Sequence, residues 1–181
     1  MSDTPVEIEI VQSLSQIAPE DWDACACPES FDGGAPDDPF TTYRFLNALE
    51  QSGSVGQGTG WQPQYLTAKL NGELIGVAPL YAKNHSQGEY IFDHNWAHAY
   101  ENAGGRYYPK LQVAVPFTPA TGPRLLSKTL DGKVALLSAM AQACEQLDCS
   151  GAHLTFLTDE DRAATKAAGF LQRTDRQFHF I

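Results

Sequence analysis

The spacing of apolar residues along the chain predicts several β-strands. Residues 6–11 (VEIEIV) alternate apolar and acidic positions, which is typical of a strand with one buried face. Two longer apolar segments, WQPQYLTAKL and ELIGVAPLYAK, flank Asn71-Gly72, a residue pair that favours a tight hairpin turn. Shorter strands are predicted over residues 89–93, 110–115, 151–157 and 170–181.

Other segments have the 3.6-residue period of helices. These are residues 18–25, 40–53, about ten residues after Asp93, 132–148 with Asp131 as the expected N-cap, and 158–169. Helices and strands therefore alternate, with a hairpin early in the chain and a strand–helix–strand unit late. This order predicts an α/β (α+β mixed) fold in one domain over residues 1–181, with a central mixed sheet flanked by helices.

Composition and charge narrow the class of protein. Hydrophobic residues make up 43% of the chain and charged residues 19%, as in soluble globular proteins. The net charge is −10, and residues 1–60 hold eleven acidic residues against Arg44 alone, which argues against a nucleic-acid partner. The sequence shows neither an apolar run that could span a bilayer nor a secretory leader, so we expect a cytoplasmic protein without a membrane span.

The segment FDHNWAHAYENAGGRYYPK (92–110) is the densest in chemically active side chains. His94 and His98 lie four residues apart, as in the H-E-x-x-H motif of zinc hydrolases, but Asn95 occupies the position of the catalytic glutamate. A metallohydrolase centred on the two histidines is thus the weakest hypothesis, and we predict no metal. The same segment places aromatic rings beside cations, which suits a groove for sugars, peptides or carboxylates.

Several segments resemble one known family. TTYRFLNALEQSGSVGQGTGWQPQYL, GVAPLYAKNHSQGEYIFD, AYENAGGRYYPKLQVAVPFTPATGPRLL and AAGFLQRTDRQFHF are similar to Fem-related peptidoglycan biosynthesis/recognition proteins, which are placed in the GNAT acyl-CoA N-acyltransferase superfamily. The resemblance covers residue 38 to the end. Family members generally have two GNAT-like halves, so the resemblance implies that this chain corresponds to the first half, with a second half C-terminal to it.

The resemblance implies transfer of an acyl group to an amine of a peptidoglycan precursor, or of a related amino sugar or peptide. This half would carry out the transfer or bind the acceptor; the alternative is a recognition module without catalysis. The candidate catalytic residues are Asp93, Glu101 and Tyr108. The candidate substrate-binding residues are Trp96, Tyr100, Arg106, Tyr107, Lys110, Phe117, Thr118 and Arg124.

The expected cofactor depends on the loop after the strand at 110–115. GNAT domains hold the CoA pyrophosphate there with a Q/R-x-x-G-x-G/A loop, whereas this chain has PFTPATGPRLL, whose prolines lack N–H groups. We therefore expect no cofactor in this half, and an acyl-CoA or aminoacyl donor only in the full-length protein.

Overall fold

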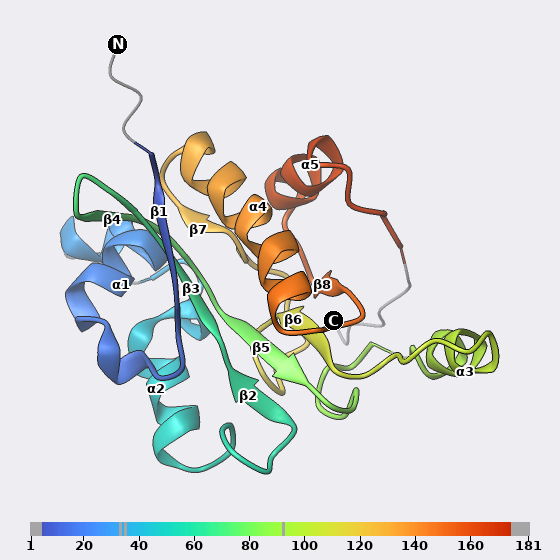
Figure 1. Cartoon of the computed structure of the whole chain (residues 1–181). Coiled ribbons are helices and arrows are strands. Elements are labelled where there is room, and N and C mark those ends of the chain that lie inside the picture. The colour runs from blue at the N-terminus through green and yellow to red at the C-terminus, as the bar shows by residue number, and fades with distance from the viewer. Residues whose placement is uncertain (1–4, 33, 35, 92, 175–181) are drawn as a thin grey trace, which may run out of the picture.

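The computed structural model describes residues 5–32, 34, 36–91 and 93–174. In these ranges the predicted alternation of helices and strands is present, and the fold is mixed α/β (Figure 1). The strands are β1 (Glu7–Val11), β2 (Trp61–Pro63), β3 (Tyr65–Leu70), β4 (Glu73–Ala78), β5 (Leu80–Lys83), β6 (Lys110–Val113), β7 (Leu126–Ser127) and β8 (Ala152–Leu154). The α-helices are α1 (Pro19–Ala26), α2 (Tyr43–Gln51), α3 (His94–Asn102), α4 (Leu130–Gln146) and α5 (Asp159–Ala167), and 3-10 turns cover Leu14–Gln16, Pro28–Asp32 and Pro39–Thr41.

One long hairpin connects two sheets. Its turn is Asn71-Gly72, as predicted, and both residues have positive φ (54° and 82°), as a two-residue hairpin turn requires. Each arm is interrupted once: Gln64 separates β2 from β3, and Pro79 separates β4 from β5. The predicted central sheet is therefore divided into a wholly antiparallel sheet, β1-β3-β4-β7, and a second sheet, β2-β5-β6-β8, in which only the β6–β8 pair is parallel.

Helices cover both faces of the first sheet. Helices α1 and α2 pack on one face around Trp22, Leu46 and Tyr65, whereas α4 packs on the other face and reaches the second sheet (Figure 1). The core under α4 contains Leu66, Leu136 and Met140, all fully buried. Helix α3 lies to one side of both sheets (Figure 1). The site described below is formed by the second sheet and by the segments that lead to α3 and β6.

Two of the predicted strands are wrong in the described residues. Residues 89–91 and 93 are not a strand, because Tyr90 has a left-handed φ of 56° that an extended chain cannot adopt. Residues 170–174 form no strand either, and Leu171 is fully exposed; residues 175–181 lie outside the described residues.

The start of α4 also differs from the prediction. Thr129, not Asp131, is the N-cap: its hydroxyl accepts from the Gly132 N–H at 3.1 Å, and Asp131 lies in the first turn. Threonine serves as a cap here because its backbone is extended (φ −122°, ψ 147°), which directs its oxygen at the free amides of the first turn.

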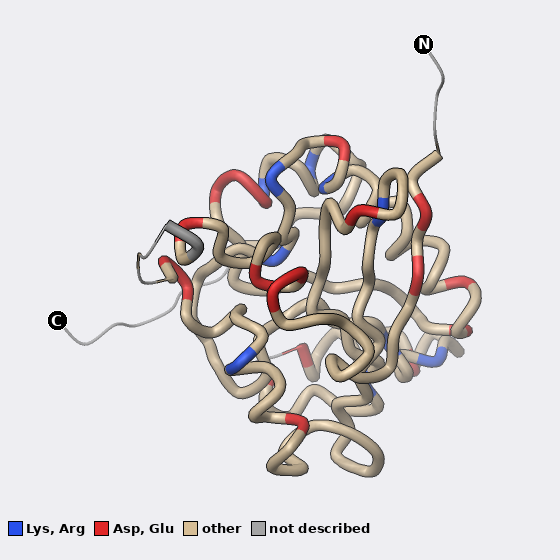
Figure 2. The backbone as a smooth tube through the Cα atoms, turned by 90° about the vertical axis from the view of Figure 1, so that its left-hand side faces the viewer, with Lys and Arg blue, Asp and Glu red and all other residues tan. Residues whose placement is uncertain are grey.

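Acidic residues outnumber basic residues along the chain. Figure 2 shows acidic residues along much of the backbone, with the fewer Lys and Arg residues set among them. None of the helices in the described part of the chain combines the length and apolar character needed to cross a bilayer.

Candidate functional site

A group of buried charges lies where β5 ends and β6 begins, and the segment before α3 supplies two carboxylates to it. We call Lys83, Glu89, Asp93 and Lys110 the buried ion cluster; each is at most 3% exposed. Lys110 is its centre, because its Nζ donates to Asp93 Oδ2 (2.6 Å) and to Glu89 Oε2 (2.8 Å). β5 and β6 pair directly at Lys83 and Lys110, which is why two lysines distant in sequence come together.

Lys83 forms the second half of the cluster. Its Nζ donates to Gln87 O (3.2 Å), lies 3.4 Å from the centre of the Trp61 ring and is 3.9 Å from Glu89 Oε1. Glu89 thus lies between two lysines. An ammonium over an indole face is a favourable cation–π contact, and burial strengthens it.

Two tyrosines and a serine extend the hydrogen-bonded network around Lys110. Tyr107 donates its hydroxyl proton to Asp93 Oδ2 (2.8 Å), and the Tyr108 hydroxyl is hydrogen bonded to Ser86 Oγ (2.7 Å). Lys110 Nζ also donates to Ser86 (3.0 Å). The segment RYYPK therefore supplies three side chains to one hydrogen-bonded network.

The network fixes the charge states of its members. Burial opposes ionisation of Asp93, but the hydrogen bonds from Lys110 and Tyr107 outweigh it and hold the Asp93 pKa at about 2. Burial lowers the pKa of Lys83 to about 7 and raises that of Glu89, because in each case it outweighs the attraction of the opposite charge. Burial, and then Lys110, lower the pKa of His153 to about 4, so this histidine is neutral at pH 7.

Stability should follow the titration of Asp93. Its pKa is lower in the folded chain (about 2) than its usual value of 3.8, so the ionised group contributes stability above pH 4 and loses it as the pH falls through 2. We expect a contribution of about 2 kcal/mol at pH 7. In urea titrations, Asp93→Asn should lose this amount at pH 7 and approach the parent protein near pH 2; a constant deficit at every pH would contradict the assignment.

Two carboxylate oxygens of the cluster lack partners. Within the described residues, Glu89 Oε1 and Asp93 Oδ1 are buried and accept no hydrogen bond. A buried polar atom without a partner carries a desolvation cost of about 1–3 kcal/mol, and such atoms are uncommon in stable proteins.

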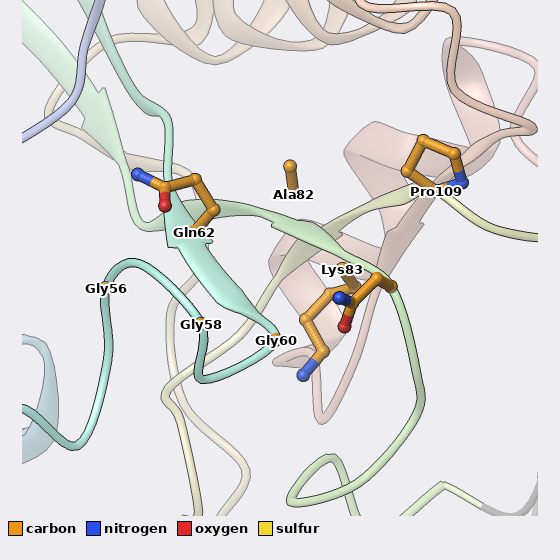
Figure 3. A pocket seen from close by; sticks show the side chains of 8 residues that line it. Gly56, Gly58, Gly60, Gln62, Ala82, Lys83 and Pro109 are labelled. Atoms are coloured by element: carbon orange, nitrogen blue, oxygen red, sulfur yellow. The ribbon is translucent and has the colours of Figure 1, made fainter.

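A pocket of about 220 Å³ adjoins the cluster at Lys83 (Figure 3). We call it the glycine-loop pocket; it is lined by Gly56, Gly58, Gly60, Gln62, Ala82, Lys83, Asn84 and Pro109. The three glycines have positive φ (127°, 82° and 78°), which lets the loop turn tightly beside β2. Figure 3 shows the Lys83 side chain extending from β5 beneath Gly60.

The structure brings together only part of the predicted site. Asp93, Tyr107, Tyr108 and Lys110 belong to one network, as described above. The other predicted residues of the α3 region lie outside it: Trp96 and Tyr100 are 60% and 48% exposed, and Glu101 and Arg106 are also exposed. Arg106 is ion paired with Asp148.

The three predicted residues after β6 lie apart from Lys110. Phe117 packs against Trp61 (5.6 Å between ring centres), and Thr118 donates its hydroxyl to Pro116 O (3.1 Å). Arg124 is buried, and its guanidinium donates to three backbone carbonyls, those of Ala120, Pro123 and Thr155. Binding of a substrate anion by Arg124 stays a prediction.

Sequence reasoning missed Lys83, Ser86 and Glu89. The available signal was the end of the hairpin arm, where Lys83 continues the apolar alternation of Pro79 and Tyr81 with a charged residue. A lysine at an inward-facing strand position needs a buried partner, and Glu89, six residues later, supplies it.

The loop between β6 and β7 does not fit a CoA pyrophosphate. Six of its amide N–H groups already donate within the protein: those of Ala114, Phe117, Thr118, Gly122, Arg124 and Leu125. Asp161 Oδ2 accepts the last two, at 2.6 and 3.1 Å. The N-terminus of α4 is capped by Thr129 and carries Asp131 in its first turn, which would repel a phosphate.

The histidines of α3 lie on an exposed helix. His94 and His98 are exposed, and no group of three or more His, Cys, Asp or Glu side chains within the described residues is arranged to hold a metal ion. The four cysteines are free thiols.

The hairpin with its two interrupted arms, the parallel β6–β8 pair and the long helix α4 together define a GNAT-type N-acyltransferase fold. An aminoglycoside N-acetyltransferase solved in complex with CoA superposes with a TM-score of 0.52 at 14% identity, over 98% of this chain and 94% of that chain. A predicted acetyltransferase from Clostridium acetobutylicum, solved with acetyl-CoA, gives a TM-score of 0.51 at 14% identity, over 98% and 96%.

The chain belongs to the FemAB-like family, described as peptidoglycan biosynthesis/recognition, whose profile matches residues 13–181. No curated protein sequence was found to match it. The expected family and the expected GNAT-like fold are therefore confirmed.

Proposed function

We propose that this chain is the acceptor-binding half of a FemAB-like N-acyltransferase. Its ligand would be an amine-bearing peptidoglycan precursor, or a related amino sugar or peptide. Membership of the FemAB-like family supports the substrate class, and the acyltransferase fold supports the reaction class. A second GNAT-like half would supply the acyl or aminoacyl donor.

The observation that carries this proposal is the loop between β6 and β7. A donor site for CoA needs free backbone amides in the loop that leads to a helix, and here Asp161 and backbone carbonyls already accept six amides of the loop between β6 and β7. The beginning of β6 instead offers the buried ion cluster at Lys110 and the glycine-loop pocket, which Pro109 helps to line. This half therefore has features suited to binding a polar small molecule but not to binding CoA.

In the proposed reaction the acceptor amine attacks the carbonyl carbon of the donor. The new C–N bond forms, the leaving group departs with its electron pair, and a base takes the proton from nitrogen. Asp93, with a pKa of about 2 and two strong donors, is a weak base, so we assign it the positioning of Lys110 and Tyr107. Tyr108 is half-buried, and its hydroxyl would contact the acceptor. Glu101, exposed on α3, is retained as the predicted base.

Calorimetric titration tests the proposal. We expect an N-acetylmuramyl pentapeptide to bind and acetyl-CoA not to bind. Tyr108→Phe should weaken binding of the pentapeptide about tenfold, because it removes one hydrogen bond. Tyr43→Phe makes the same change on α2, away from the site, and should leave the affinity unchanged. Tight binding of acetyl-CoA, or no binding of the pentapeptide, would contradict the proposal.

A recognition module without catalysis is the second candidate. The loop between β6 and β7, whose backbone amides already donate within the protein, also favours this candidate, because a chain without a donor site can still bind a cell-wall ligand. Binding of the pentapeptide with no transfer from any acyl or aminoacyl donor, tested on the full-length protein, would select it.

A further inference from the structure

Two of the four cysteines meet where α4 ends. The Cys149 N–H donates to Cys144 O (2.9 Å), the Asp148 N–H donates to Glu145 O (3.2 Å), and Asp148 has a left-handed φ of 51°. These are the two hydrogen bonds and the left-handed residue of a Schellman motif. The side chains of the first and last residues of this motif commonly contact each other, and here both residues are cysteine.

The two thiols lie close enough to be joined. The hydrogen bond between their backbones holds the two Cα atoms no more than about 6.8 Å apart, which is within the range that a disulfide can span. Cys144 Sγ donates to Cys149 O at 3.2 Å, so the Cys144 thiol already lies against the backbone of Cys149. Both side chains are half-buried, so a small oxidant can reach them from the surface.

The turn after α4 supports the RYYPK segment. Asp148 accepts from Arg106 Nη2 through its backbone carbonyl (3.0 Å) and through its carboxylate. Ser150 donates its N–H to Pro109 O (2.9 Å) and its hydroxyl to Tyr107 O. The residue between these two is the second cysteine of the pair. Figure 1 shows the end of α4 beside β6 and β8, where these contacts are made.

We propose that Cys144 and Cys149 form a reversible disulfide, and that this bond stiffens the turn that holds the RYYPK segment. The oxidant would be a small-molecule disulfide such as glutathione disulfide. One cysteine thiolate attacks it, which forms a mixed disulfide and releases one glutathione; the second thiolate then attacks the protein-bound sulfur, which forms the protein disulfide and releases the other. Two protein thiols are oxidised, and one glutathione disulfide is reduced to two glutathiones.

The other two cysteines provide an internal comparison. Cys25 and Cys27 are buried at the end of α1, and their sulfurs have different partners. Cys25 Sγ donates to Leu74 O (3.7 Å), whereas Cys27 Sγ accepts from the Ser30 hydroxyl (3.5 Å). We therefore expect oxidation to be confined to the pair at the end of α4.

The rate of oxidation should rise with pH. Burial is the main cause that raises the pKa of both thiols, and it raises that of Cys149 to about 11. Glu145 adds to the effect at Cys144; at Cys149, Cys144 and Asp148 add to it and Arg106 opposes it. The thiolate is the attacking form, so the rate should increase about tenfold per unit between pH 7 and pH 9.

Intact mass and thiol counting on the whole chain measure the oxidation. After incubation with glutathione disulfide, we expect the protein to lose two hydrogen atoms and two of its four thiols, without retaining glutathione. Peptide mapping should place the bond between Cys144 and Cys149, and dithiothreitol should reverse it. The Tm should rise by about 5 °C, because a bond that closes this short loop constrains the unfolded chain.

Hydrogen exchange tests the link to the RYYPK segment. Amide exchange in residues 106–111 should slow about tenfold on oxidation, because the locked turn opens less often. Cys149→Ser keeps the size of the side chain and removes the pair, so glutathione disulfide should leave its exchange unchanged. Cys27→Ser removes a thiol from the end of α1 and should respond as the parent protein does.

Two sets of outcomes contradict the proposal. Four free thiols remaining at pH 9, a stable glutathione adduct in place of the bond, or a disulfide that still forms in Cys149→Ser would overturn the assignment of the pair. A disulfide that leaves exchange in residues 106–111 unchanged would overturn the link to the RYYPK segment. Neither measurement uses an acyl donor or an acceptor, so the proposed function stands or fails independently of both.

Discussion

Replacing Lys110 by methionine should lower the free energy of unfolding by about 3–5 kcal/mol at pH 7. The ammonium of Lys110 is the shared partner of Asp93 and Glu89, and all three side chains are almost fully buried. Methionine keeps much of the volume but removes the charge. Two carboxylates would then remain in the interior without their main donor, and a buried charge without a partner is among the most costly defects in a protein.

Urea denaturation of the parent protein and the variant measures this loss. Lys69→Met provides the matched control, because Lys69 makes one ion pair, with Glu9, whose members are 39% and 59% exposed. The control should change stability by at most about 1 kcal/mol, since water and salt screen an exposed pair. Similar losses in the two variants would show that Lys110 does not hold the cluster together.

The second large effect concerns Asp161, at the start of α5. Asp161→Asn should cost about 3 kcal/mol, because the fully buried carboxylate accepts from the backbone N–H groups of Arg124 and Leu125 and from Lys133 Nζ. An amide has one acceptor oxygen instead of two, and its NH₂ group would face donors. The change would loosen the loop between β6 and β7 from α5.

The neighbouring residue offers the control for this prediction. Glu160 also pairs with Lys133 (2.8 Å), but its side chain is 79% exposed. Glu160→Gln should change stability by about 0.5 kcal/mol or less, as measured by the same urea titration. If Glu160→Gln proves as costly as Asp161→Asn, the ion pair with Lys133 is responsible and the backbone contacts of Asp161 contribute little.

Local sequence patterns predicted most of the fold. The alternation at residues 6–11, the Asn71-Gly72 turn and the period of α2, α4 and α5 are each specified within a few residues, so no distant contact is needed to predict them. The family was also visible in short segments such as YYPKLQVAVPFTP, and the match over residues 13–181 confirms it. In the described part of residues 89–93 the expected strand is wrong, because Glu89 and Asp93 turn inward to Lys110, a contact that the local pattern does not contain.

The site was decided by tertiary structure. The sequence by itself determined an acidic α/β protein of the FemAB-like family, and it marked Asp93, Tyr107, Tyr108 and Lys110 as chemically rich. Only the pairing of β5 with β6 placed Lys83 beside the same cluster, and only burial lowered its pKa toward neutrality. Charge states of this kind depend on desolvation and on partners distant in the sequence, and both arise only when the chain has folded.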